Sequence, residues 1–174
     1  KEHNFAIIRP SNKQSSSDTD TAIAICTNKF KDIENRSFTE SGGFAIAVAT
    51  EIKTEKKVAF ISAHIRGFDL EEPEDHMKEE AAAGDRDISN LLNYLKQCCA
   101  DCETIIVGAD MNAIPEIYRK RFLLFEHAGY ELHRTGKPTS LMSHNGMGET
   151  PQLQQRELDY IFVKHNKKES IVDK

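Results

Sequence analysis

Residues 104–108 (TIIVG) form a short, apolar run rich in β-branched side chains, which is typical of a strand buried at the centre of a sheet. The segment before it repeats its apolar residues at intervals of three and four, and this spacing predicts an amphipathic helix. The apolar positions of that helix are Ile88, Leu91, Leu92, Leu95, Cys98, Cys99 and Cys102. Gly84 marks a possible break in the helix, and Asp85 or Asp87 could cap its later part.

Other segments extend this pattern of elements. Residues 44–52 (FAIAVATEI) and 58–65 (VAFISAHI) predict two antiparallel neighbouring strands, because a short charged turn joins them. Residues 157–163 (ELDYIFV) predict the last strand. A second helix is expected over residues 117–127, ending at Gly129. We expect loops over the polar residues 11–21 and over residues 136–156, which hold Gly, Pro, Ser, Thr and Asn without periodicity.

The length of 174 residues predicts a single domain, residues 1–174, and 39% apolar with 29% charged residues are the proportions of a folded protein. No apolar run approaches the ~20 residues that cross a bilayer, so we expect no integral membrane segment. A net charge of -5 argues against a protein that coats DNA by bulk charge, although a local basic groove stays possible. No sequence pattern predicts the oligomeric state.

The four cysteines predict buried thiols rather than a zinc centre. Three of them lie in the stretch CCADC, and no second cluster completes a tetrahedral site. Free cysteine packs as a small apolar residue and favours a reducing compartment, which points to the cytoplasm. Because the chain opens on Lys1 rather than Met, its start is interpreted as trimmed or processed, and the sequence does not fix the localisation further.

Polar residues at the ends of the predicted strands are the candidates for chemistry. Asp110 and Asn112 follow the central strand, and residues two apart in extended chain face the same side. A carboxylate and an amide together suit a hard cation and a phosphoryl oxygen. A turn or a helix cap is the structural alternative for this D-x-N sequence.

Two further residues complete the set. His64 ends an apolar strand, where a site residue and an ordinary hydrogen-bonded histidine are both common. Asp159 lies inside the apolar segment LDYIFV, and a buried carboxylate there needs a partner such as histidine or arginine, because an uncompensated buried charge costs several kcal/mol. A salt bridge with Arg156 or an edge position is the structural alternative.

The order of these patterns is more specific than any one of them. The succession of strand-x-H, helix, apolar strand G-x-D-x-N-x-x-P, helix, P-T loop and R-x-L-D-Y-I-F-V resembles the endonuclease/exonuclease/phosphatase superfamily, the deoxyribonuclease I-like proteins. The resemblance runs from about Ala22 to Val163, and IIVGADMNAIP and RELDYIFV carry most of it.

The resemblance implies an α/β (α+β) fold of two packed, mostly antiparallel sheets flanked by helices, a four-layer sandwich that is incomplete at both ends. It implies hydrolysis of a phosphate ester with Mg²⁺ or Mn²⁺, by in-line attack of water. His64 would contact the scissile phosphate, Asp110 would bind metal and orient water, and Asn112 would hold a phosphoryl oxygen. Asp159 would orient a catalytic histidine, and Thr139 of the Pro138–Thr139 pair would contact substrate.

Several features depart from the family pattern. The early asparagine and the glutamate that is the main metal ligand have no match, and the closing S-D-H is absent. His165 follows Asp159 too closely to take that histidine's place, and Ala109 separates Gly108 from Asp110. As it stands, the chain is expected to show weak or no turnover. A catalytically degenerate binding or scaffold domain that retains the fold is the alternative function.

The substrate class stays open between a phosphodiester of nucleic acid and a phosphoinositide or lipid head group. Arg66, just after His64, is the expected contact to a further phosphate. The triplet Arg119, Lys120 and Arg121 is interpreted as a solvated face that could also touch phosphate if it lies beside the site. The acidic residues 71–80 are interpreted as an exposed loop, with cation binding as the alternative.

Overall fold

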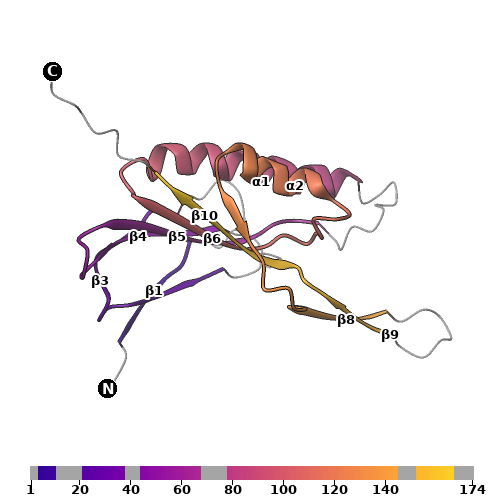
Figure 1. Cartoon of the computed structure of the whole chain (residues 1–174), viewed down its shortest axis with the longest axis horizontal. Coiled ribbons are helices and arrows are strands. Elements are labelled where there is room, and N and C mark those ends of the chain that lie inside the picture. Colours follow the sequence, from indigo (N-terminus) through magenta and orange to yellow (C-terminus); the bar gives the residue numbers. More distant parts are fainter. Residues whose placement is uncertain (1–3, 11–20, 38–43, 68–77, 145–151, 167–174) are drawn as a thin grey trace.

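The chain folds around a six-stranded sheet with the order β3-β4-β5-β6-β10-β7 (Figure 1). The structure is a computed structural model, and it describes residues 4–10, 21–37, 44–67, 78–144 and 152–166. The strands of this sheet are β3 (Phe30–Asn35), β4 (Phe44–Glu51), β5 (Lys57–His64), β6 (Thr104–Asp110), β7 (Glu131–His133) and β10 (Asp159–His165). Both strands next to β6 are long, so the apolar run at 104–108 is central, as predicted.

The connection from β5 to β6 is the one that determines where the chemistry lies. These two strands pair in parallel, whereas the other described pairs of the sheet are antiparallel. A parallel pair needs a crossover, which here contains helix α1 (Lys78–Cys98). The carboxyl ends of β5 and β6 therefore meet at one edge of the sheet, and β10 enters at the same edge because it runs antiparallel to β6.

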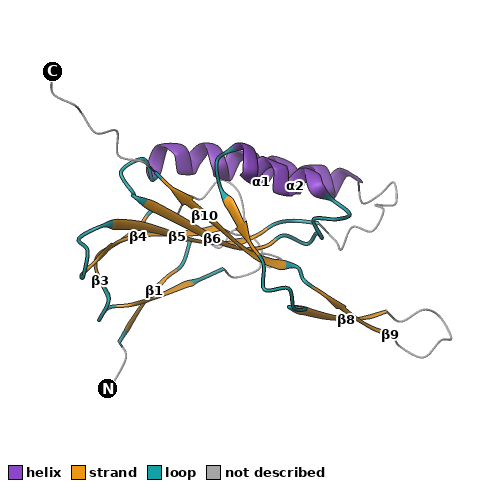
Figure 2. Cartoon of the chain, viewed as in Figure 1, coloured by secondary structure: helices purple, strands orange, loops and turns teal. Residues whose placement is uncertain are grey.

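One face of the sheet is covered by α1 and by α2 (Arg119–His127), as Figure 2 shows. The apolar side of α1 packs there through Ile88, Leu91 and Leu95, which have no exposed surface. From α2, Phe125 stacks on Phe162 of β10 with ring centroids 4.0 Å apart. This face holds the main core, and the three-and-four spacing of the apolar residues of α1 is the sequence signal for it.

The other face is covered in part by a small sheet of β1 (Phe5–Ile8) and β2 (Ile23–Cys26), which pair antiparallel. Beneath it, β4 is buried on both faces, and large and small residues alternate along it. Its large residues belong to the main core, and its alanines, Ala45, Ala47 and Ala49, pack with Ile23 and Ile25 of β2. The small alanine side chains let the second sheet approach closely.

The expected fold class is confirmed: two sheets pack face to face, and helices flank the larger one. The part of the chain that the structure describes forms three of the expected four layers, namely helices, the six-stranded sheet and the two-stranded sheet. Antiparallel pairing predominates, as expected.

The expected boundaries of the long helix are wrong at its start. Helix α1 already begins at Lys78, so Gly84 lies inside the helix and does not break it. Asp85 and Asp87 likewise lie inside, where they are buried and ion-paired and are not caps. The sequence signal failed here because the apolar spacing starts only at Ile88, while tertiary contacts stabilise the two preceding turns.

The predicted 136–156 loop is also corrected. Residues Ser140–His144 (β8) and Gln152–Arg156 (β9) pair antiparallel as a hairpin that projects from the body (Figure 1). The short strands β3 and β7 were not expected either. The interpretations of residues 11–20 and 71–77 as loops concern segments outside the described residues, whereas residues 78–80 of the predicted acidic loop belong to α1. The second helix is confirmed to within two residues.

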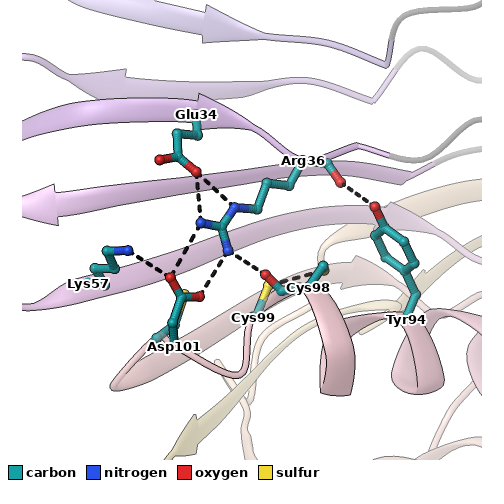
Figure 3. Close-up of polar contacts among 8 residues, drawn as sticks. Glu34, Arg36, Lys57, Tyr94, Cys98, Cys99 and Asp101 are labelled. Atoms are coloured by element: carbon teal, nitrogen blue, oxygen red, sulfur yellow. Dashed lines mark hydrogen bonds and ion pairs between the residues drawn. The ribbon is translucent and has the colours of Figure 1, made fainter.

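The end of the sheet remote from the carboxyl end of β5 is fastened by a network of charges around Arg36 (Figure 3). The guanidinium of Arg36 binds Glu34 through Nη2 at 2.7 Å and Asp101 through Nη1 at 2.9 Å, and it also donates to the carbonyl oxygen of Cys98. Lys57 pairs with Asp101 at 2.7 Å. The network joins β3 and β5 to the turn that follows α1.

Replacing Asp101 with Asn tests this network through the pH dependence of stability. Hydrogen bonds from Arg36 and Lys57 hold the pKa of Asp101 well below its usual range. A lowered pKa stabilises the fold fully above the unfolded-state pKa of about 4, and this contribution is lost progressively as the pH falls from there through the much lower folded-state pKa. Because Asp101 is about half exposed, solvent screens the pair, and we expect Asp101→Asn to cost about 1 kcal/mol at neutral pH and progressively less as the pH falls towards the folded-state pKa.

The measurement is the free energy of unfolding by urea across that pH range. Glu79→Gln, an exposed carboxylate on α1, is the matched control and should leave the pH profile unchanged. An equal loss for Asp101→Asn at acid and neutral pH would contradict the proposed charge contribution.

The cysteines are free thiols, as expected. Cys99 and Cys102 are buried in the main core, while Cys26 and Cys98 are half-buried. No helix among the described residues is long and apolar enough to span a bilayer.

Candidate active site

Three of the predicted site residues lie side by side in one row across the sheet. His64 ends β5, Asp110 ends β6 and Asp159 begins β10, and the strand registers pair His64 with Asp110 and Asp110 with Asp159. Directly opposite residues point to the same face and lie about 5 Å apart at Cβ. The imidazole and the two carboxylates therefore share one face at one edge of the sheet.

The chain turns sharply after Asp110, and this turn shapes the site. Asp110 Oδ1 accepts the backbone N–H of Asn112 at 2.9 Å, which is the Asx turn that the D-x-N sequence allows. Asn112 adopts φ 44°, in the left-handed region that asparagine tolerates better than most residues. Asn112 consequently does not continue the extended strand, and its side chain does not lie in the row formed by His64, Asp110 and Asp159.

The side-chain amide of Asn112 points back at β5. Its Nδ2 donates to the carbonyl oxygen of Ile65 at 2.9 Å and lies 3.2 Å from His64 Nε2. A carbonyl oxygen only accepts, so the atom facing Ile65 must be the NH₂ group. Nε2 of His64 is then the acceptor of the second N–H, and neutral His64 carries its proton on Nδ1.

This hydrogen bonding bears on the predicted role of Asn112. Both hydrogens of its amide already have acceptors, so the expected donation to a phosphoryl oxygen would require breaking one of these bonds. The amide orients the imidazole of His64 and leaves Nδ1–H directed towards the row, where Nδ1 lies 4.0 Å from Asp110 Oδ2.

Burial is the main cause that raises the pKa of Asp110 above its ordinary value, and the facing charge of Asp159 acts in the same direction. The N–H of Asn112, His64 and Arg121 oppose this rise. Two carboxylates facing each other across a strand pair destabilise the metal-free protein. A cation between them would relieve the repulsion.

The prediction that Asp159 is buried is wrong, because the first residue of β10 faces the solvent side of the sheet edge. The next residue, Tyr160, is buried instead. Thr139 Oγ1 accepts the N–H groups of Leu158 and Asp159, each at 3.0 Å, and so holds the start of β10. Thr139 was expected to contact substrate; the structure shows it positioning the backbone of Asp159.

A cleft of about 810 Å³ opens beside the row. His64, Asp110, Asp159 and Thr139 line it, and Asn112 and Arg66 are not among its lining residues. Polar residues that sequence reasoning missed also line it: Ser62, His133, Arg134 and Thr135. Ser62 lies two residues before His64 on the same face, so strand periodicity would have found it, whereas three-residue β7 is too short for a pattern.

The guanidinium of Arg66 is ion-paired with another side chain. Its guanidinium binds Asp87 of α1 with Nε–Oδ2 at 2.6 Å and Nη2–Oδ1 at 2.7 Å, although the side chain is 58% exposed. The expected contact of Arg66 to a second phosphate would therefore compete with a two-point ion pair.

The triplet Arg119, Lys120 and Arg121 is only partly a solvated face. Arg119 and Lys120 are exposed, and they pair with Glu126 and Asp85. Arg121 is wholly buried and contacts Asp85, which corrects the interpretation for that residue. Three adjacent charged residues do not by themselves show which one faces the core, and the spacing of the apolar residues in α2 did not predict which side of the helix is buried.

At the level of sequence, neither a protein-family model nor a curated protein matches the chain. Solved structures do match it. They include D. rerio TDP2 complexed with single strand DNA product (TM-score 0.57, 16% identity) and an endonuclease/exonuclease/phosphatase from Bacteroides vulgatus (TM-score 0.59, 12% identity). The alignments cover 94% and 92% of this chain.

The endonuclease domain of TRAS1, a telomere-specific non-LTR retrotransposon, matches as well, with TM-score 0.55 and 14% identity over 92% of the chain. The chain has the endonuclease/exonuclease/phosphatase fold. It spans 63% of the TDP2 chain, 64% of the Bacteroides chain and 67% of the TRAS1 domain.

The two facing carboxylates, those of Asp110 and Asp159, are the residues of this site that could hold a metal ion. The described residues contain no group of three or more His, Cys, Asp or Glu side chains arranged for a metal. Mg²⁺ is commonly held by one or two carboxylates, with waters and substrate phosphate completing its shell. Asp110 and Asp159 fit that requirement, whereas the predicted main glutamate ligand is not identified among the described residues.

Proposed function

We propose that the chain carries a metal-dependent phosphoesterase site made by His64, Asp110 and Asp159. The observation that carries the proposal is their in-register row at the edge of a cleft. These residues come from parts of the sequence about a hundred positions apart, and each of them lies in a segment that resembles a motif of the family. The shared fold of the solved structures supports the same activity.

Each side chain has a chemical role that its geometry permits. Asp110 and Asp159 would hold Mg²⁺ or Mn²⁺, which supplies charge neutralisation for the phosphate oxygens when bound. Asp110, whose pKa is raised by burial, would also orient the attacking water. The Nδ1–H of His64 would donate to a non-bridging phosphate oxygen, and Asn112 would hold the imidazole in the tautomer that can do so.

The substrate proposal is a phosphodiester of nucleic acid or a phosphorylated head group. The names of two structural neighbours, an endonuclease domain and a protein complexed with a DNA product, support the first class. Arg134, at the cleft, is already bound to Glu116 and Glu157, so it is no free phosphate ligand. No lining residue distinguishes the two classes by charge.

The deciding experiment is a hydrolysis assay with Mg²⁺, using single-stranded DNA, a phosphoinositide and a simple diester. We expect weak cleavage, because the motifs at both ends of the family pattern have no match in this chain, and we expect EDTA to abolish it. A nuclease should also lose DNA binding steeply as salt rises, whereas a phosphatase should release inorganic phosphate. Metal and substrate binding without any turnover would instead favour the degenerate binding domain, and no binding of either would reject both functions.

Replacing Asp159 with Asn tests the facing carboxylates without an activity assay. In the metal-free chain the change removes like-charge repulsion, so the melting temperature should rise by about 1–2 °C. The further rise caused by added Mg²⁺ should fall by about half or more, because one donor is lost. Thermal unfolding with and without Mg²⁺ measures both effects.

Glu79→Gln, on α1, is the control and should leave the Mg²⁺ effect intact. If Asp159→Asn keeps the full Mg²⁺-induced rise, Asp159 is not a metal ligand, and the proposed donor pair must be abandoned.

A further inference from the structure

Arg121 hydrogen-bonds to none of the candidate reacting groups, yet it contacts the backbone next to Asp110 and two residues beyond His64. Its guanidinium has no exposed surface. We propose that Arg121 is a positioning residue, which fixes the turns that carry Asp110, Asn112 and His64 and thereby sets the tautomer of His64. The kinetic part of this inference rests on the proposed function, and the structural part does not.

Three carbonyl groups from separate segments accept hydrogen bonds from this one guanidinium. Nη1 donates to the oxygen of Met111 at 2.6 Å, and Nη2 donates to the oxygens of Arg66 at 2.7 Å and Ala81 at 3.3 Å. Met111 lies between the two residues of the D-x-N turn, and Arg66 lies two residues beyond His64. Arg121 therefore links the ends of β6 and β5 to the start of α1.

The turn that Arg121 holds has an uncommon backbone conformation. Asn112 has φ 44°, in the left-handed region that few residues other than glycine and asparagine adopt. The carbonyl of Met111 belongs to the peptide unit that leads into Asn112, so a rotation of this peptide unit would move the side-chain amide of Asn112. That side-chain amide would then lose Ile65 and His64 as acceptors, and the imidazole of His64 would be free to exchange its proton between its two nitrogens.

The surroundings of Arg121 are built for a guanidinium. A Cβ at Gly67 or Gly84 would lie 2.7 Å or 2.4 Å from Nη2, so both glycines make room for it. Asp85 balances the buried charge, with Oδ1 3.3 Å from Nε. The planar guanidinium of arginine has N–H donors on three nitrogens and can donate to several carbonyl groups at once. The single ammonium group of lysine cannot reach carbonyl groups that are spaced in the same way.

Stability alone does not account for this arrangement. Replacing a buried ion pair by apolar residues of similar size is often neutral or stabilising, because desolvation offsets the attraction. What an apolar side chain cannot do is fix the orientation of three carbonyl groups. The geometry thus points to positioning of the site turns as the role of the buried charge.

The test compares Asp85→Asn with the charge-balanced double variant Arg121→Met/Asp85→Asn. The first removes the balancing charge and keeps the carbonyl donors, and the second removes both. The readouts are the ¹⁵N shifts of the two His64 ring nitrogens and of the Asn112 amide, the unfolding midpoint, and kcat/KM on the simple diester with Mg²⁺. Arg119→Ala, exposed on the same helix, is the control and should change none of them.

In the wild type and in Asp85→Asn, we expect well-separated His64 ring shifts with the proton on Nδ1. In the double variant the two ring shifts should converge, and kcat/KM should fall by about 10²-fold, mostly in kcat, since a small misplacement of reacting groups is costly. Arg121→Lys, which retains the charge, should give shifts and a rate between these extremes.

The inference is overturned if the folded double variant keeps wild-type His64 and Asn112 shifts. It is also overturned if Asp85→Asn alone changes those shifts as much as the double variant does, since Arg121 would then act only through stability. If the double variant does not fold, wild-type shifts in Arg121→Lys overturn it. A wild type without any hydrolysis rejects the proposed function, while the shifts still decide the role of Arg121.

Discussion

Replacing Asp110 with Ala should lower kcat/KM for a phosphate ester by about 10³-fold in the presence of Mg²⁺. The carboxylate lies at the centre of the row, between His64 and Asp159, so its loss removes a proposed metal ligand and the group that orients water. The measurement is the initial rate over a range of substrate and Mg²⁺ concentrations. Unchanged turnover would remove Asp110 from the site.

The companion variant Asp110→Asn separates charge from local geometry. Its amide oxygen can still accept the N–H of residue 112, so the turn should persist while the charge is lost. We expect a rate nearly as low as that of Asp110→Ala. Asp101→Asn, at the opposite end of the sheet beside Lys57, is the matched control and should keep wild-type kcat/KM.

Gly84→Ala should lower the free energy of unfolding by about 3 kcal/mol, although alanine is ordinarily the better helix former. A Cβ at this position would lie 2.2 Å from the carbonyl oxygen of Arg66 and 2.4 Å from Arg121 Nη2. Backbone atoms cannot move away at small cost, so α1 would have to shift from the turn after β5. Urea unfolding monitored by circular dichroism measures the loss.

The control for this change is Asn90→Ala, at an exposed position on the same helix. It should leave stability unchanged or raise it by about 0.5 kcal/mol through helix propensity alone. A Gly84→Ala variant as stable as Asn90→Ala would mean that α1 does not approach the Arg66 carbonyl as closely as the structure shows.

The start of α1 around Gly84 is a part of the fold that the sequence did not predict. A glycine within a polar stretch usually weakens a helix, so a break was a reasonable expectation. The residues that stabilise the first turns of α1 are the partners of Asp85 and Asp87, namely Arg121 and Arg66, and both lie outside the helix. Contacts between residues 21 and 36 positions apart leave no periodic trace in a sequence.

Some features of the candidate site were likewise predicted from the sequence, and others were not. His64 and Asp110 were predicted because each follows an apolar strand, and Asp159 because it is a carboxylate inside an apolar segment; the strand registers bring the three together. The burial of Asp159 was predicted wrongly, and neither the hydrogen bonds of the Asn112 amide nor the ion pair of Arg66 was predicted. Each depends on which face or partner a side chain meets after the chain has turned.

The amino-acid order alone predicted the strands β4, β5, β6 and β10, the helix that separates β5 from β6, and the polar residues near the ends of these strands, because periodic burial and local turn preferences are properties of neighbouring residues. Only the tertiary structure decided that Arg121 is buried, that Asn112 holds His64, and that His133 and Thr135 share the cleft. The reason is physical: a buried charge or an oriented imidazole depends on partners that only long-range packing supplies.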